Sequence, residues 1–180
     1  MFIDIHVHTR RRPCPPRIAG DKLTYASPEE LLEAYDEVGI ERAVVLPGVN
    51  PECNYGVQAV EDVIELSHLT NGRLIPFCNV DPRAMTNSDR APFEWIFKYY
   101  RDLGCKGVGE ICANLPMLDP RVLALFKGAE AAGLPVTFPS GCWSAMTAAK
   151  AGSWIFVSTA RLPTGIWATP LQWNCPTAVS

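Results

Sequence analysis

Residues 2–8 read FIDIHVH, and this stretch decides the fold. Apolar and β-branched residues dominate it, which is typical of a buried β-strand. Side chains alternate along a strand, so Asp4, His6 and His8 are expected on one face. The two imidazoles then lie one pleat apart at the carboxyl end of the strand, where β/α folds place their active sites.

The following segments alternate between helical and strand patterns. Helices are predicted at 27–39, 57–72, 92–104 and 119–133, and strands at 42–46, 74–78, 107–111 and 135–138. Apolar strands that alternate with amphipathic helices indicate a parallel sheet covered by helices, an α/β fold. An open doubly wound sheet and a TIM-type β/α barrel both fit. A complete barrel takes about 250 residues, so the chain is expected to hold about the first half of one.

Composition and charge exclude several classes of protein. The 180 residues carry a formal net charge of −3, which gives no electrostatic basis for binding nucleic acid. The sequence contains no apolar run of about 18 residues, so no membrane span is expected. The N-terminus lacks the pattern of a signal peptide. The seven cysteines include no C-x-x-C pair, which favours reduced thiols over a disulfide framework. A cytoplasmic protein is therefore expected.

The composition changes near residue 138, which suggests a unit at 1–138 and an atypical tail at 139–180. Glu130 is the last acidic residue, and Lys150 and Arg161 are the only charged residues after Phe138. The tail has no sustained helical or strand period. It is interpreted either as a loop-rich extension or as a segment from another reading frame.

The pattern Asp4-x-His6-x-His8 predicts a divalent metal site. Two imidazoles on one strand face can bind one ion. Asp4 lies one step deeper and is expected to support the ligands rather than to bind the metal. The alternative is two chance histidines at a strand end.

These residues resemble the opening strand of the amidohydrolase superfamily, in particular the amidohydrolase-related group that includes aminocarboxymuconate-semialdehyde-decarboxylase-like enzymes. The resemblance covers about residues 1–138 and continues through IERAVVLPG, RLIPFCNVDPR, GCKGVGEI, LDP and AAGLPVTF. It implies a TIM-type barrel with a catalytic divalent metal, usually zinc. It also implies that His6 and His8 are metal ligands, joined by Glu110 at the end of the fourth strand. The alternative for Glu110 is a loop acid facing solvent or capping the next segment.

The sequence also departs from this family. Relatives carry a histidine after the fifth strand, where this chain has Pro139, and a further histidine and an aspartate later in the barrel. No Asp or His follows Glu130 here, so weak or absent turnover is expected from the chain as written.

Three functions follow from these observations. The first is a metal-dependent hydrolase that acts on a small-molecule substrate. The second is a metal-dependent decarboxylase acting on a small carboxylic acid, and the third is a non-catalytic truncated barrel. Arg10 is a candidate substrate-binding residue for a carboxylate, although it also fits a solvated loop. Exposed strand edges of a half-barrel would favour a homodimer.

Overall fold

A computed structural model describes residues 2–16, 19–20, 25–52 and 56–137. The predicted tail at 139–180 lies outside the described residues. The described part contains three strands and four helices, in the order β1 (Phe2–Val7), α1 (Pro28–Val38), β2 (Ile40–Val45), α2 (Val60–Leu69), β3 (Leu74–Pro76), α3 (Phe93–Asp102) and α4 (Pro120–Ala132). No helix among these residues has the length and apolar character needed to cross a membrane.

Local signals set the ends of the first helix. The side chain of Ser27 accepts a hydrogen bond from the Glu30 amide, and the Glu30 side chain accepts one from the Ser27 amide. This reciprocal capping box satisfies two amides that have no partner inside the helix. Gly39 ends α1 in the left-handed conformation at φ 77°, where a side chain would be strained.

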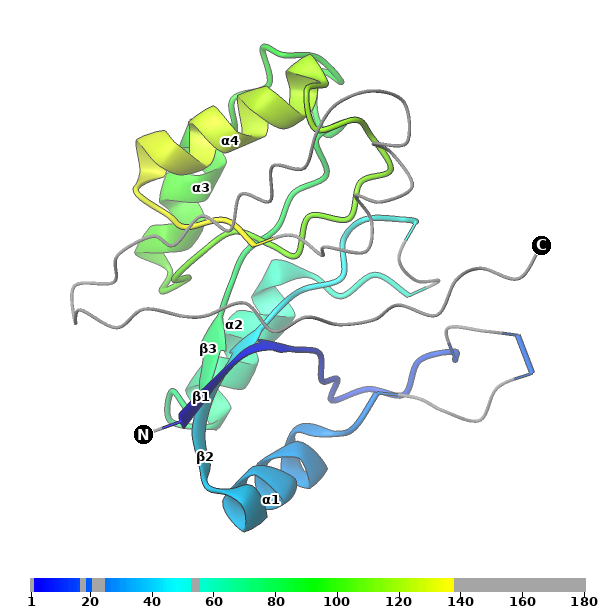
Figure 1. The fold of residues 1–180 in the computed structure, drawn as a ribbon, viewed down its shortest axis with the longest axis vertical. Helices are drawn as coiled ribbons and strands as arrows, with labels where there is room; N and C mark the ends of the chain where they lie inside the picture. Colours follow the sequence, from blue (N-terminus) through cyan, green and yellow to red (C-terminus); the bar gives the residue numbers. More distant parts are fainter. Residues whose placement is uncertain (1, 17–18, 21–24, 53–55, 138–180) are drawn as a thin grey trace, which may run out of the picture.

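The strands form a parallel sheet in the order β1-β2-β3. Two further parallel bridges, Cys78 to Val108 and Val108 to Val136, extend it in chain order. The parallel α/β arrangement expected from the sequence is confirmed. Within the described residues, the predicted strands at 107–111 and 135–138 contribute only single bridges, at Val108 and Val136, and residue 138 lies outside the described part. Figure 1 shows α1 and α2 around β1–β3, with α3 and α4 farther along the sheet.

Helix α2 begins later than the sequence suggested. The helix was expected near Val57, but that residue is 67% exposed and the helix starts at Val60. Ala59, which precedes the helix, has no side-chain oxygen to cap it, and Asp62 accepts from the Ala59 amide instead. The apolar pattern that includes Val57 therefore predicted a helix start three residues before the observed one.

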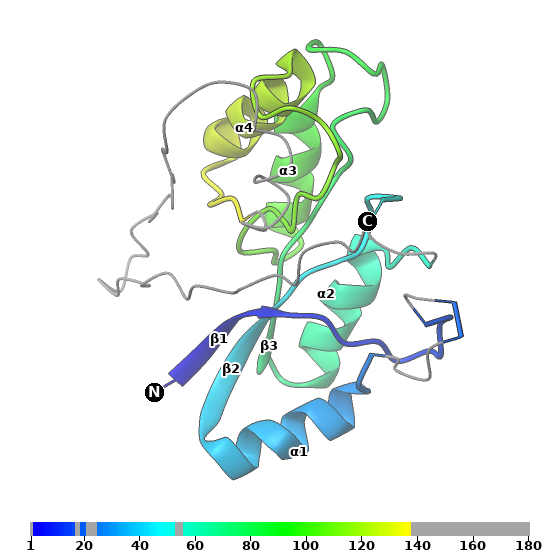
Figure 2. The same ribbon diagram turned by 45° about the vertical axis from the view of Figure 1, so that its right-hand side comes forward.

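Two hydrophobic clusters lie between the sheet and its helices. The first joins α1 and α2 to β2 and β3, through Tyr35, Ala43, Val45, Val63, Leu66 and Leu74. The second packs α3 and α4 against the extended part of the sheet, and Phe93, Phe97, Val108 and Leu125 are among its most buried members. Both views of the ribbon show α3 and α4 side by side (Figures 1 and 2). The two clusters hold the carboxyl ends of the strands in one layer.

Candidate metal centre

The structure brings His6, His8 and Glu110 together at the carboxyl ends of the strands. Nε2 of His6 lies 3.5 Å from Oε1 of Glu110, and Nε2 of His8 lies 3.4 Å from Oε2. One ligand atom from each residue can be chosen so that all three lie within 4.8 Å of one another. The two histidines therefore face a carboxylate from a segment far away in the sequence.

The backbone before Glu110 places its side chain. The Gly109 amide donates to the Cys78 carbonyl at 2.7 Å, next to the bridge formed by Val108. Gly109 has φ 147°, and a Cβ built on it would lie 2.5 Å from the carbonyl oxygen of Thr137. Only glycine allows the chain to pass so close to its neighbour. Glu110 therefore follows directly after a glycine that no residue with a side chain could replace without a clash with Thr137.

The orientation of the His8 ring is set by the end of β2. Nδ1 of His8 lies 3.0 Å from the Leu46 carbonyl oxygen. A carbonyl oxygen only accepts, so this contact requires a proton on Nδ1 and leaves Nε2 as the ring nitrogen that faces Glu110. A histidine ligand commonly donates from its second nitrogen to a carbonyl or carboxylate, which fixes the tautomer. The His8 contact has this form.

Glu110 and His6 shift one another's pKa. Burial alone would raise the pKa of Glu110, but hydrogen bonding to His6 and His8 outweighs burial and lowers the pKa to about 2. The contact with Glu110 in turn raises the pKa of His6 above 6.5, against the opposing effect of burial. The site therefore holds a negative charge that attracts a cation, either a proton on an imidazole or a metal ion.

Two imidazoles and one carboxylate match the donor set of a catalytic zinc site, in which three protein ligands leave a position for water. Ligand atoms about 2.1 Å from a tetrahedral ion lie about 3.4 Å from each other, close to the two nitrogen–oxygen distances here. The side chains of His6 and His8 are 42% and 29% exposed, whereas that of Glu110 is 13% exposed. The residues fit a divalent ion that is open to solvent on the histidine side.

Asp4 contacts the site through the main chain. Its Oδ1 accepts from the His6 amide at 2.9 Å, and its Oδ2 accepts from the Tyr35 hydroxyl at 2.6 Å. The β1–β2 register shifts between Asp4 and Val7, so the regular pairing of the two strands is interrupted between these residues. Asp4 links the histidine strand to helix α1, and its supporting role toward the metal remains a prediction.

Arg10 lies beside the site without joining the three candidate ligands. Its Nη2 donates to the Gly56 carbonyl at 2.6 Å, and its guanidinium lies 5.0 Å from the centre of the Tyr25 ring. The Tyr25 ring also meets the His8 ring edge-to-face, at 6.0 Å between centroids. Tyr25 was not singled out from the sequence, since no local pattern connects it to His8. A substrate-binding role for Arg10 remains a prediction.

Two asparagines near Glu110 were underestimated from the sequence. Neither Asn50 nor Asn79 is among the candidate site residues predicted from the sequence, yet each is 2% exposed. The available signal was a polar side chain directly after the apolar strand run LIPFC. Both asparagines hydrogen-bond to the segment that carries Glu110.

No protein-family model matches the chain, and no curated protein matches it significantly. Among solved structures, the chain is similar to a probable 2-pyrone-4,6-dicarboxylic acid hydrolase from Acinetobacter baumannii, whose crystal structure contains citric acid. The two are 14% identical, with a TM-score of 0.49, and the match covers 76% of this chain. It covers 48% of the other, so the chain spans about half the length of that protein.

Proposed function

We propose that this protein is a metal-dependent hydrolase of the amidohydrolase type, built on the first half of a TIM-type β/α barrel. His6, His8 and Glu110 would hold the divalent ion, with zinc as the first choice. The observation that carries the proposal is the convergence of these three side chains, whose ligand atoms lie within 4.8 Å of one another. Two imidazoles and a carboxylate are preferred ligands of zinc.

Each residue has a distinct part in the proposed site. A bound divalent ion supplies Lewis-acid activation of water and of a carbonyl group at neutral pH. Glu110 supplies the negative charge, and His8 offers Nε2 because its Nδ1 donates to Leu46. Asp4 restrains the backbone of His6. A small-molecule substrate would approach from the exposed histidine side, where Arg10 can bind a carboxylate.

Arg10 also supports the second candidate, a metal-dependent decarboxylase acting on a small carboxylic acid. Its guanidinium lies against Tyr25, and Tyr25 contacts His8. This connection places a cationic side chain near the metal ligands, where it would orient an acidic substrate of either enzyme. Product analysis separates the two reactions, because only the decarboxylase releases carbon dioxide.

Metal binding is tested first and by itself. After treatment with a chelator, the full chain is titrated with Zn²⁺ by calorimetry, beside Glu110→Ala and the double variant His6→Ala, His8→Ala. We expect the wild type to bind Zn²⁺ at least about 100-fold more tightly than the double variant, because removing ligands is costlier than removing their supporting contacts. His68→Ala is the matched control, since His68 is an exposed histidine in the last turn of α2.

Turnover is tested second, with zinc- and manganese-loaded protein against ester, amide and aromatic acid substrates. Hydrolysis above the level of the double histidine variant supports the hydrolase, and carbon dioxide release supports the decarboxylase. Tight metal binding without either product would favour a non-catalytic metal-binding protein. Equal Zn²⁺ affinity of the wild type and the double variant would contradict the proposed site.

A further inference from the structure

Two buried asparagines connect three loops at the mouth of the sheet. Asn50 follows β2 and Asn79 follows β3, and each is 2% exposed. Nδ2 of Asn79 donates to the Glu110 carbonyl at 2.5 Å and to Oδ1 of Asn50 at 3.1 Å. The same Oδ1 accepts from the Cys112 amide at 3.0 Å. The main chain is thus held at Glu110 and again at Cys112.

The chemistry of the partners determines how both amides are turned. Nδ2 of Asn79 faces two oxygen atoms, so a flipped amide would set oxygen against oxygen. Oδ1 of Asn50 receives two donors, while its Nδ2 donates to Asp81 at 2.9 Å. Each orientation therefore agrees with the other, and neither asparagine can flip without breaking several hydrogen bonds.

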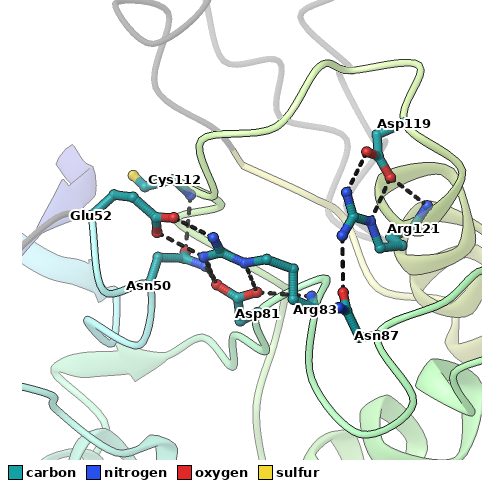
Figure 3. A network of polar contacts seen from close by, with 8 residues as sticks. All are labelled: Asn50, Glu52, Asp81, Arg83, Asn87, Cys112, Asp119 and Arg121. Atoms are coloured by element: carbon teal, nitrogen blue, oxygen red, sulfur yellow. Dashed lines mark hydrogen bonds and ion pairs between the residues drawn. The ribbon is translucent and has the colours of Figure 1, made fainter.

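Charged residues secure the far end of this network. Arg83 donates to both oxygens of Asp81, at 2.8 and 2.6 Å, and to Glu52 at 2.9 Å. Figure 3 shows the side chains of Glu52, Arg83, Asp81 and Asn50 in a continuous series that ends at the Cys112 amide. A bidentate arginine–carboxylate pair is geometrically specific. Asp81 is therefore a fixed acceptor for Asn50 and limits where the asparagine pair can lie.

Stability alone does not account for Asn79. Its Oδ1 is buried and has no hydrogen-bond partner in the part of the chain that the structure describes. An unsatisfied buried acceptor loses its hydration without compensation, so it costs stability. The reason for an asparagine at this position is the hydrogen bond from its Nδ2 to the Glu110 carbonyl.

The sheet links Glu110 to the histidines only through the strands that lie between them. His6 and His8 come from the end of β1, whereas Glu110 follows Val108, and β2 and β3 lie between the two segments. Within the described part of the chain, no strand pairing connects these two segments directly. The asparagine pair bridges the loop after β2 and the loop after β3 to the main chain of Glu110, and so restrains the carboxylate relative to the imidazoles.

We propose that Asn79, supported by Asn50, is a positioning residue that holds the Glu110 main chain so that its carboxylate reaches the ion bound by His6 and His8. This inference rests on the proposed metal site. Asn79 itself does not touch the metal. It acts through Glu110, in the way that outer hydrogen bonds orient metal ligands in other proteins.

A double-mutant cycle in Zn²⁺ affinity tests this inference on the full chain. The variants are Asn79→Ala, Glu110→Ala and both together, with calorimetry as the readout. We expect Asn79→Ala to weaken Zn²⁺ binding about 10- to 100-fold. In the Glu110→Ala background the same substitution should change affinity less than about 2-fold, because the group it positions is absent. General destabilisation would instead lower affinity in both backgrounds.

Two further variants keep the test decisive. Asn87→Ala is the matched control, since Asn87 hydrogen-bonds to Arg121 in the separate group of Figure 3, and it should bind Zn²⁺ like the wild type. Asn50→Ala removes the acceptor of the Cys112 amide, so faster hydrogen exchange at Cys112 is expected without metal. It should also weaken Zn²⁺ binding, which provides a second route if Asn79→Ala does not fold.

The outcomes separate this inference from the proposed function. If the wild type binds Zn²⁺ tightly and Asn79→Ala binds it equally well, the positioning role is wrong and the metal site stands. Equal losses in both backgrounds of the cycle would also overturn the positioning role. If the wild type binds no better than His6→Ala, His8→Ala, the metal site is wrong, and the inference fails with it.

Discussion

Nδ1 of His8 donates to the main-chain carbonyl of Leu46 at 3.0 Å. The acceptor belongs to the backbone at the end of β2, so this contact depends on the fold rather than on a second side chain. It places a proton on Nδ1 and leaves Nε2 as the atom that would coordinate a metal ion. The position of His8 directly after β1 therefore decides which ring nitrogen faces the candidate site.

We predict that His8 keeps a proton on Nδ1 when Zn²⁺ is bound and coordinates the ion through Nε2. Long-range proton–nitrogen NMR spectra of the ring distinguish the two nitrogens directly. His68, which is exposed on α2, serves as the reference ring because it is remote from the candidate ligands. Coordination of zinc through Nδ1 of His8 would contradict the orientation described here.

We expect the pH dependence of stability without metal to follow the His6–Glu110 pair. The pKa of Glu110 is lowered from 4.5 to about 2, so its contribution is present above pH 4.5 and is lost as the pH falls toward 2. The pKa of His6 is raised above 6.5, so its contribution is present below pH 6.5 and is lost as the pH rises through the higher value. The pair therefore stabilises the fold most between these limits.

Urea unfolding in the presence of a chelator, between about pH 3 and pH 9, measures this profile. Glu110→Gln should flatten both sides of it, because the substitution removes the shared charge. Glu37→Gln is the control, since Glu37 is exposed on α1. A Glu110→Gln profile as curved as that of the wild type would show that the pair does not couple to folding.

Gly128→Ala is expected to destabilise the protein, although alanine is the better helix former. Within a helix the exchange normally stabilises by about 1 kcal/mol. Here the new Cβ would lie 2.6 Å from Cβ of Phe93 and 2.9 Å from the Glu94 amide nitrogen. Relieving such a contact costs about 1–3 kcal/mol, so the free energy of unfolding should fall by about 1 kcal/mol. Urea unfolding measures the change, with exposed Lys127→Ala as a control, and a gain in stability would show that α3 and α4 are not packed this closely.

Tyr35→Phe should cost about 1–2 kcal/mol of unfolding free energy. The Tyr35 hydroxyl donates to Asp4 at 2.6 Å, and Tyr35 is 7% exposed. Its loss leaves one oxygen of a partly buried carboxyl without a donor. Tyr99→Phe is the matched control, because Tyr99 is 51% exposed and its variant should unfold like the wild type. Equal stability of Tyr35→Phe and wild type would mean that the bond to Asp4 contributes nothing net.

The sequence determined those features that depend on near neighbours. Ser27 and Glu30 specify a helix start, and Gly39 and Gly133 specify helix ends, because capping and left-handed turns involve residues within one helical turn. The apolar run before His6 similarly specified the first strand, and the repeated alternation of strands and helices specified a parallel sheet. Pairing in parallel strands needs a helical crossover between them, so this pattern is visible in the sequence order.

The tertiary structure decided which distant groups meet. Local pattern could place His6 and His8 together, but Glu110 was assigned to them only through a family resemblance, because β1 and Val108 are not sheet neighbours. The sequence shows Asn79 directly after a strand, but it does not show the partners of Asn50 and Asn79, since these include the backbone groups of Glu110 and Cys112, which every residue type carries. The late start of α2 and the single bridges at Val108 and Val136 likewise depend on packing. Short-range interactions can be predicted from neighbouring residues in the sequence. A metal site assembled from separate strands forms only when the sheet has brought the ends of those strands together.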